Sequence, residues 1–231
     1  MKLYRILYFG SWGYGKAGLE ALVKCQNVKI IRVYTKKDSI SKNPYCNMVY
    51  DLAIKNLLPV IDSNKNLMKK EEFESNVIGQ GEIDFIISCC YERIFSSKIL
   101  DLPKITSINV HPSILPKYRG VKPLENAIAN GEKVTGITIH EITQGIDEGD
   151  IILQYAKIPI KCFDTYSVLY ERQCHAIKNI LTRFFKKPKY FIRHKVEQNH
   201  SLATYAPRIN FQIADEDTAQ EIRQTALQNT F

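Results

Sequence analysis

The sequence contains no long hydrophobic segment. No apolar run in the 231-residue chain approaches the ~20 residues that a membrane-spanning helix needs. The N-terminal stretch MKLYRILYFGSWGYG has a short apolar run, but this run meets a glycine-rich turn rather than a small-residue cleavage site. We therefore expect a soluble protein that stays in the cytoplasm and does not insert into a membrane.

The sequence also lacks a disulfide framework. Its six cysteines, at positions 25, 46, 89, 90, 162 and 174, do not follow the regular spacing of a disulfide-stapled domain. The adjacent Cys89 and Cys90 would point to opposite faces of a strand, and Cys174 with His175 has no second pair at ligand spacing. We therefore expect reduced thiols and no bound metal ion.

The charge is unbalanced. The formal net charge is +8, and the stretch RFFKKPKYFIRHK (183–195) carries much of the surplus. Such a run is usually a solvated face, yet it also favours an anionic partner. No nucleic-acid-binding motif accompanies it, so we expect a phosphorylated small substrate and no nucleic acid.

The apolar pattern alternates between short β-branched runs and amphipathic segments, which is typical of an α/β fold with a mainly parallel sheet. The last two strands alternate like a hairpin with a long connecting loop. The pattern predicts strands over 3–10, 28–35, 59–62, 84–90, 107–111, 135–142 and 149–160, and helices over 15–25, 47–57, 67–81, 123–131 and 164–185.

Two parts of the chain are expected. Residues 1–160 are predicted to form a catalytic domain, and residues 161–231 a C-terminal helix and extension. The polar, helix-like tail at 214–231 is expected to pack weakly or against a partner. Apolar residues scattered over 188–231 are compatible with the contact of a homodimer.

Two polar side chains stand close together at the end of an apolar strand in SINVHPSILPKYRGVKP (107–123). Side chains two apart on a strand share a face, so Asn109 and His111 are expected to project together into the crevice at the carboxyl ends of the strands. An amide can donate to an oxyanion, and an imidazole can accept the proton that a nucleophile loses. Asp147, in the glycine-flanked loop TQGIDEGD, can hold the histidine. The three residues predict chemistry at a carbonyl.

Each of these residues also has a plainer interpretation. A histidine at a strand end is more often a hydrogen-bonded structural residue, and an aspartate between glycines is more often a turn former. Asn109 is equally suited to anchor a loop. Ser113 lies nearby, but no G-x-S-x-G motif surrounds it, so a serine hydrolase is not indicated. The residues alone leave both interpretations open.

The stretch INVHPSILPKYRGVKPLENAIANGEKVTGITIHEITQGIDEGDIILQ (108–154) resembles the core of the folate-dependent formyltransferases. It follows the family pattern N-x-H-x-S-x-L-P, R-G, P, A-I, G, T-G-x-T and D-x-G without a gap. The preceding DFIISCCYERIFSSKILDLP (84–103) is similar to the family's strand and pterin-binding loop. The resemblance implies a Rossmann-like formyltransferase core that uses N10-formyltetrahydrofolate.

The resemblance also implies roles for individual residues. Asn109 would polarise the formyl oxygen, His111 would take the proton of the attacking amine, and Asp147 would hold His111. The pterin would lie against the backbone of one loop after the fourth strand and of the segment leading to Asp147. The predicted cofactor-binding residues are Tyr91, Glu92, Arg93, Ile94 and Gly145.

Three branches of this family differ outside the core. The turn GSWGYGKAG (10–18) departs from the G-N-G-S-N-like turn of the ribonucleotide formyltransferases. The methionyl-tRNA enzymes add a C-terminal barrel of roughly a hundred residues, whereas only about 70 residues follow residue 160 here. ATYAPRI (203–209) resembles the segment after the core in the tRNA and sugar enzymes. The chain therefore looks most like the nucleotide-sugar N-formyltransferases.

The sugar branch implies a nucleotide-linked dideoxy amino sugar as acceptor, with dTDP-4-amino-4,6-dideoxyglucose as the favoured example, in the synthesis of surface polysaccharide such as O-antigen. A pyrophosphate favours basic loop residues, and aromatic rings can enclose the sugar or base, although packing explains them equally well. The predicted substrate-binding residues are Trp12, Lys117, Tyr118, Arg119 and Lys122. Two alternatives remain open: a methionyl-tRNA formyltransferase-like enzyme, and a folate- or nucleotide-binding module without catalysis.

Overall fold

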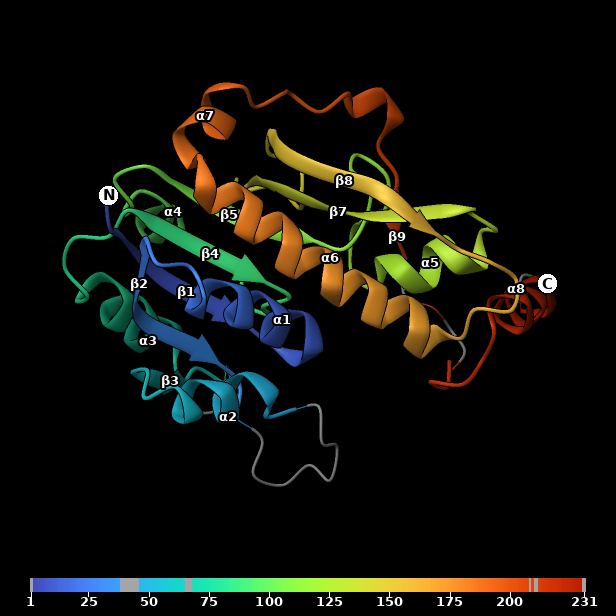
Figure 1. The fold of residues 1–231 in the computed structure, drawn as a ribbon, viewed down its shortest axis with the longest axis horizontal. Coiled ribbons are helices and arrows are strands. Elements are labelled where there is room, and N and C mark those ends of the chain that lie inside the picture. The colour runs from blue at the N-terminus through green and yellow to red at the C-terminus, as the bar shows by residue number, and fades with distance from the viewer. Residues whose placement is uncertain (1, 38–45, 65–67, 208, 210–211, 230–231) are drawn as a thin grey trace.

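A computed structural model of the protein describes residues 2–37, 46–64, 68–207, 209 and 212–229. Its centre is a seven-stranded sheet in the order β3-β2-β1-β4-β5-β7-β8 (Figure 1). The strands are β1 Tyr4–Gly10, β2 Val28–Thr35, β3 Val60–Asp62, β4 Phe85–Cys89, β5 Thr106–His111, β7 Val134–Glu141 and β8 Ile151–Pro159.

The sheet is parallel from β3 to β5 and antiparallel beyond. β7 pairs antiparallel with both β5 and β8. The mainly parallel α/β sheet that the sequence predicts is therefore confirmed, and so is the hairpin of its last two long strands.

The alternation of side chains along β1 explains why helices cover both faces of the sheet. Ile6 and Tyr8 belong to one hydrophobic cluster, and Leu7 and Phe9 belong to another. The first cluster is covered by α1 Trp12–Val23, α2 Met48–Lys55 and α6 Tyr166–Lys186, with α1 and α6 packed side by side (Figure 1). The second is covered by α3 Lys70–Ile78 and α4 Ser97–Leu100.

The long helix α6 belongs to the same core as the strands. It begins at Thr165, whose side chain accepts a hydrogen bond from the Val168 amide. Its buried residues include Ile177, Leu181 and Phe184, which pack in the cluster that also contains residues of β1, β4 and β7. Residues before and after position 160 therefore pack in one hydrophobic cluster.

The C-terminal segment returns across the main body. After α7 Pro188–Arg193 come a short 3-10 helix (η1, His200–Leu202), β9 Tyr205–Ala206 and α8 Ala219–Gln228. β9 pairs in parallel with β6 Arg119–Gly120.

The helix α8 differs from the expected weakly packed tail. It begins with a capping box of Thr218 and Glu221. Its Ala219 and Ile222 are buried in a cluster with Leu124, from α5 Pro123–Ala129. The start of this helix is thus packed against the chain itself, while Leu227 near its end is 67% exposed. Residue 67, where the third predicted helix begins, lies outside the described residues. Within the described ranges, no helix is both long enough and apolar enough to span a membrane.

The packing of α6 predicts a large loss of stability when its buried aromatic ring is removed. Phe184 is fully buried, so Phe184→Ala is expected to lower the free energy of unfolding by about 3–5 kcal/mol, measured by urea denaturation. The matched change Phe163→Ala, at a ring that is 68% exposed, is expected to cost less than about 1 kcal/mol. Equal losses would contradict a single core that includes α6.

Candidate active site

The candidate site lies where the strand order reverses. β2 and β3 lie on one side of β1, while β4 and β5 lie on the other, so the reversal falls between β1 and β4. In open α/β sheets, ligands bind outside the carboxyl ends of the strands at such a point. Ser11 and Trp12 follow β1, Cys90 and Tyr91 follow β4, and His111 ends β5. The chain therefore places its polar strand ends around one crevice.

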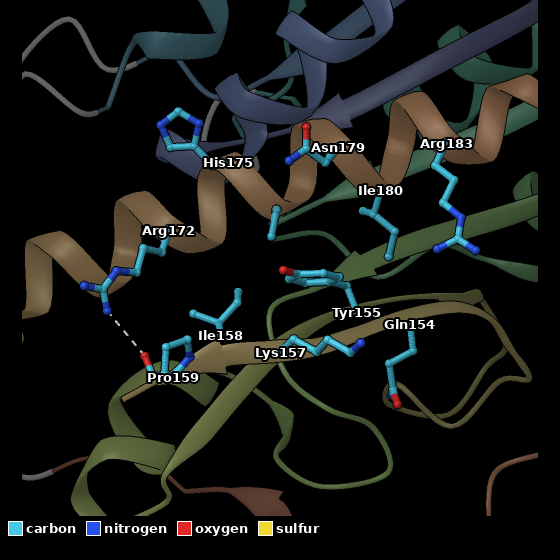
Figure 2. Close-up of a pocket in the computed structure, with 11 residues that line it drawn as sticks. Gln154, Tyr155, Lys157, Ile158, Pro159, Arg172, His175, Asn179, Ile180 and Arg183 are labelled. Carbon is cyan, nitrogen blue, oxygen red and sulfur yellow. Dashed lines mark hydrogen bonds between the residues drawn. The ribbon is translucent and has the colours of Figure 1, made fainter. Parts of the chain in front are cut away.

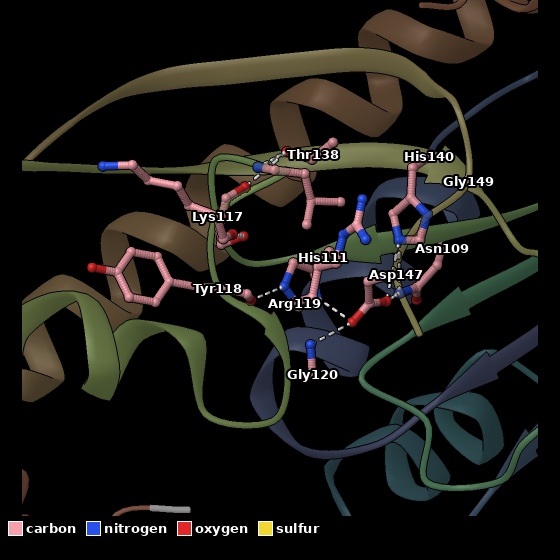
Figure 3. Close-up of polar contacts among 12 residues, drawn as sticks. Asn109, His111, Lys117, Tyr118, Arg119, Gly120, Thr138, His140, Asp147 and Gly149 are labelled. Atoms are coloured by element: carbon pink, nitrogen blue, oxygen red, sulfur yellow. Dashed lines mark hydrogen bonds and ion pairs between the residues drawn. The ribbon is translucent and has the colours of Figure 1, made fainter. Parts of the chain in front are cut away.

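The three residues predicted to act together come together around the Asp147 carboxylate (Figure 3). Asn109 Nδ2 donates to Asp147 Oδ1 at 3.1 Å. His111 Nδ1 lies 3.5 Å from Asp147 Oδ2, which also accepts the Gly120 amide at 2.8 Å. Burial alone raises the pKa of Asp147, but its interactions with His111 and His140 and the hydrogen bond from the Gly120 amide outweigh it, and the pKa lies well below its ordinary value. Asp147 is therefore a carboxylate.

The imidazole of His111 is held neutral. Its side chain is only 4% exposed, and Nε2 lies 2.7 Å from the Tyr118 carbonyl oxygen. A carbonyl only accepts, so Nε2 carries the hydrogen and Nδ1 is the basic nitrogen. Burial lowers the pKa of His111 and so does His140, and the charge of Asp147 and the Tyr118 carbonyl only partly offset them. Near pH 7, Nδ1 can therefore accept a proton beside a carboxylate.

A second histidine, which the sequence analysis missed, completes the site. His140 is 2% exposed, and its Nε2 lies 3.3 Å from Asp147 Oδ1 and 3.2 Å from Asn109 Nδ2. Its Nδ1 lies 2.8 Å from the Glu141 carbonyl oxygen, so Nδ1 carries the hydrogen in the neutral ring. Nε2 then accepts from Asn109. The strand pattern TGITIHEI could have indicated it, because the antiparallel register pairs Asn109 with His140 and His111 with Thr138.

The loop that carries Asp147 has little freedom. Asp147 adopts the left-handed conformation with φ 51°, which is uncommon for a residue with a side chain. A Cβ on Gly149 would lie 2.1 Å from the Glu141 carbonyl oxygen, so only glycine allows this approach of the two backbones. The loop is therefore fixed at both Asp147 and Gly149.

Two of the predicted cofactor-binding side chains point into the body of the protein. Tyr91 donates its hydroxyl to Ser63 Oγ at 2.6 Å and stacks on Phe73. Arg93 donates to the carbonyl oxygens of Ser63 at 2.8 Å and Met68 at 2.7 Å. These contacts hold the loop after β4 against the body of the protein through Tyr91 and Arg93.

The other predicted cofactor-binding residues lie at the surface of two loops. Glu92 is exposed, and Ile94 is 87% exposed. Gly145 lies next to the Glu148 carboxylate in the loop before Asp147. Between α4 and this loop opens a cavity of about 480 Å³. Its lining residues are Ser97, Leu100, Asp101, Pro103, Ile105, Thr106, Ser107, Glu141, Ile142, Thr143 and Gln144. Among the described residues, no three His, Cys, Asp or Glu side chains are arranged to hold a metal ion.

Three of the predicted substrate-binding residues lie in positions open to a ligand. Trp12 begins α1 and is half-buried, and Lys122 precedes α5 and is exposed. Lys117 is exposed, but its ammonium already lies 3.0 Å from Glu132. Figure 3 shows the Lys117 side chain pointing away from His111 and Asp147.

Two predicted substrate-binding residues have a different position from the one expected. Arg119 is 2% exposed, and its guanidinium donates to Gln198 Oε1 at 2.8 and 3.2 Å. Tyr118 is 8% exposed, and its hydroxyl donates to Glu132 at 3.0 Å. The expectation of exposed binding side chains is corrected for both, because their polar groups are already bound within the protein. Tyr118 serves the site through its carbonyl oxygen.

A separate cavity of about 520 Å³ lies between α6 and β8 (Figure 2). Its lining includes Lys157, Arg172 and Arg183, and Arg172 is bound to Asp164 at 2.7 and 2.8 Å. None of the residues predicted for the site line this cavity. It is therefore distinct from the crevice around His111.

The electrostatics of the site predict an unusual titration for His111. Its midpoint, followed by NMR of the ring, is expected below the ordinary histidine value of about 6.5. Asp147→Asn removes the charge that favours the imidazolium, so the midpoint is expected to fall further, by about 1 unit or more. An unchanged or raised midpoint for His111 would contradict this geometry.

The chain resembles known proteins in both sequence and fold. The chain is 37% identical over 209 residues to a methionyl-tRNA formyltransferase of Pseudothermotoga lettingae, covering 89% of this chain and 65% of that protein. The chain thus spans about 65% of the length of the first curated relatives that it matches.

Two solved structures have the same fold. A phosphoribosylglycinamide formyltransferase from Bacillus halodurans matches with a TM-score of 0.66 and 26% identity, over 80% of this chain and 96% of that one. An N-formyltransferase from Helicobacter canadensis, solved with folinic acid and dTDP-3-aminofucose, matches with a TM-score of 0.66 and 24% identity, over 96% of this chain and 78% of that one. The sequence model described as formyl transferase matches residues 5–185, and the chain therefore belongs to the formyl transferase family.

Proposed function

We propose that this protein is an N-formyltransferase that moves the formyl group of N10-formyltetrahydrofolate to a primary amine. The observation that carries the proposal is the cluster of buried His111 with half-buried Asn109 and Asp147 at the carboxyl end of β5, with contacts of 3.1 and 3.5 Å to the carboxylate. The donor supplies an activated formyl carbon, and the amine of the acceptor is the nucleophile. No covalent bond to the protein is needed, which agrees with a cluster that contains a base and a hydrogen-bond donor.

His111 is placed to take the proton that the amine loses. In its neutral form Nδ1 is free to accept, because Nε2 donates to the Tyr118 carbonyl oxygen. The imidazolium that results has an acceptor for each N–H: Tyr118 for Nε2 and the Asp147 carboxylate for Nδ1. The protein therefore stabilises the charged ring once the proton has arrived.

Asn109 is placed to donate to the oxygen of the formyl group. Both hydrogens of its amide already have acceptors, His140 Nε2 and Asp147 Oδ1. Hydrogen bonds to an ionised carboxylate are stronger than those to a neutral ring. We therefore propose that the Asn109 hydrogen now donated to His140 is donated instead to the oxyanion that develops on the formyl oxygen. The hydrogen bond to Asp147 keeps the amide in place.

The donor fits the crevice on the side of the loop after β4. A pterin is flat and carries donors and acceptors along its edge, so it needs an apolar face and accessible backbone. The exposed Ile94 and the backbone around Gly145 offer both, and the cavity of about 480 Å³ next to them mixes apolar residues such as Leu100 and Ile142 with hydroxyl groups. The side chains of Tyr91 and Arg93 bind Ser63 and hold this loop in place, so we assign them no contact with the pterin.

For the acceptor we propose a nucleotide-linked dideoxy amino sugar, with dTDP-4-amino-4,6-dideoxyglucose as the first compound to test. The support is the Helicobacter canadensis enzyme with bound dTDP-3-aminofucose, whose fold matches 96% of this chain, including its C-terminal segment. Trp12 follows β1 and is half-buried, and Lys122 is exposed two residues after Gly120, whose amide binds Asp147, so the two are candidates to contact an aromatic base and an anion. Surface polysaccharide synthesis, a cytoplasmic location and a homodimer are part of the same proposal.

Methionyl-tRNA is the second candidate acceptor. It is favoured by the 37% identity to the methionyl-tRNA formyltransferase of Pseudothermotoga lettingae and by the net charge of +8, which attracts a polyanion. Both acceptors present a primary amine, so the chemistry at His111 is the same for either.

A direct comparison of acceptors tests the proposal. Protein is incubated with N10-formyltetrahydrofolate and either dTDP-amino sugars or methionyl-tRNA, and the release of tetrahydrofolate and the mass of the acceptor are followed. We expect formylation of the amino sugar. Formylation of methionyl-tRNA alone would favour the second candidate, and no transfer to any amine would overturn the proposed chemistry.

Substitutions in the cluster test the assigned roles. His111→Ala removes the base and Asn109→Ala removes the donor, so each is expected to lower kcat by about 10²- to 10⁴-fold while the protein still binds folate. His175→Ala, at an exposed position on α6, is the control and is expected to retain wild-type activity. Near-normal turnover by His111→Ala would show that another group takes the proton.

A further inference from the structure

Gln198 connects the loop of Asp147 to a buried arginine. It lies in the C-terminal segment, beyond the part of the chain that matches the family model, and is only 3% exposed. Its amide nitrogen donates to the carbonyl oxygen of Asp147 at 2.8 Å and to that of Gly149 at 2.7 Å. Its amide oxygen accepts both Nε and Nη2 of Arg119. Every hydrogen and lone pair of this amide therefore has a partner.

The orientation of the Gln198 amide is fixed by chemistry. Carbonyl oxygens only accept, and a guanidinium only donates. A flipped amide would place its oxygen against the carbonyls of Asp147 and Gly149, and its hydrogens against Arg119. Arg119 therefore holds Gln198 in the one orientation that can bind the loop.

The segment around Gln198 is attached on both sides. Before it, Val196 forms an antiparallel bridge with Ile151, with both hydrogen bonds at 2.8 Å. After it, the Thr204 carbonyl accepts the Arg119 amide at 2.8 Å, and Thr204 Oγ1 accepts the Tyr118 amide at 2.9 Å. The segment 196–206 thus joins the start of β8 to the loop that follows His111.

The two carbonyls that Gln198 binds belong to Asp147, which lies beside His111, and to Gly149, two residues later. Asp147 adopts a left-handed conformation that a residue with a side chain keeps only when its surroundings impose it. Gln198 binds the backbone at Asp147 itself and at Gly149, and so holds the C-terminal side of this left-handed residue. Without these two hydrogen bonds, the backbone is free to relax, and the Asp147 carboxylate can then move away from His111 Nδ1.

We propose that Gln198 is a positioning residue for the formyl-transfer centre, which holds Asp147 at its distance from His111, and that Arg119 orients Gln198 for this task. The inference rests on the proposed function and extends the site into the C-terminal segment. The titratable groups that face His111 are Asp147, from the loop, and His140, from β7. Of these two, Gln198 contacts only Asp147.

Two variants test the role of Gln198. Gln198→Glu keeps an acceptor for Arg119 but removes both hydrogens given to the loop. The double change Arg119→Met with Gln198→Met removes the polar link without leaving a buried charge unpaired, which protects the fold. For each folded variant we expect kcat to fall by about 10- to 100-fold with the KM of the donor little changed, because a small misplacement of a catalytic group has an effect of this size.

The titration of His111 gives a second measurement, independent of turnover. We expect its NMR midpoint to move to lower pH in both variants, in the same direction as in Asp147→Asn and by less. Asn126→Ala is the matched control, because Asn126 is also a buried amide that binds the C-terminal segment, at the Pro207 carbonyl, without contacting Asp147. It is expected to reduce stability and leave the midpoint unchanged.

The outcomes separate the two proposals. A wild-type midpoint for His111 together with wild-type kcat in both variants would overturn the role of Gln198, as would an equal shift of the midpoint in Asn126→Ala. Absence of formyl transfer by the unmodified protein would overturn the proposed function, while the titration would still decide whether Gln198 positions Asp147.

Discussion

The rest of the site depends on the hydrogen bonds and close contacts of the Asp147 carboxylate. It binds Asn109 and the Gly120 amide and lies beside His111 and His140. Four separate elements, β5, β6, β7 and the loop itself, thus meet at one charge. A carboxylate that is largely removed from water is costly unless it is hydrogen-bonded, so the Asn109 and Gly120 contacts that stabilise the charge also fix its place beside His111.

The change from parallel to antiparallel pairing at β7 makes this arrangement possible. In a purely parallel sheet, the next strand would have to return to the same end of the sheet by a crossover connection. Here the antiparallel β7 pairs Asn109 with His140 directly. The following β7–β8 connection then brings Asp147 back to Asn109 and His111. The order and direction of the strands therefore set the positions of these side chains.

Much of the fold could be predicted from local pattern. The sequence predicts β1, β2 and β4 to within about two residues, because strands buried on both faces read as continuous apolar runs. The short elements α4, β6 and β9 were missed, since two to four residues are too few for any periodicity to emerge. The packing of α8 on α5 was also missed, because α8 reads as a polar helix and the residues that it packs against lie almost a hundred positions earlier in the sequence.

The sequence by itself determined which side chains can meet: Asn109 and His111 share a face because strand side chains alternate, and the glycine-flanked Asp147 supplies a carboxylate. Only the tertiary structure decided what surrounds them. Arg119 was expected to bind substrate with its positive charge, but the fold buries it against Gln198, which comes from a segment distant in sequence. Whether a cation faces a ligand or supports a loop depends on contacts between remote parts of the chain, and no local pattern records those.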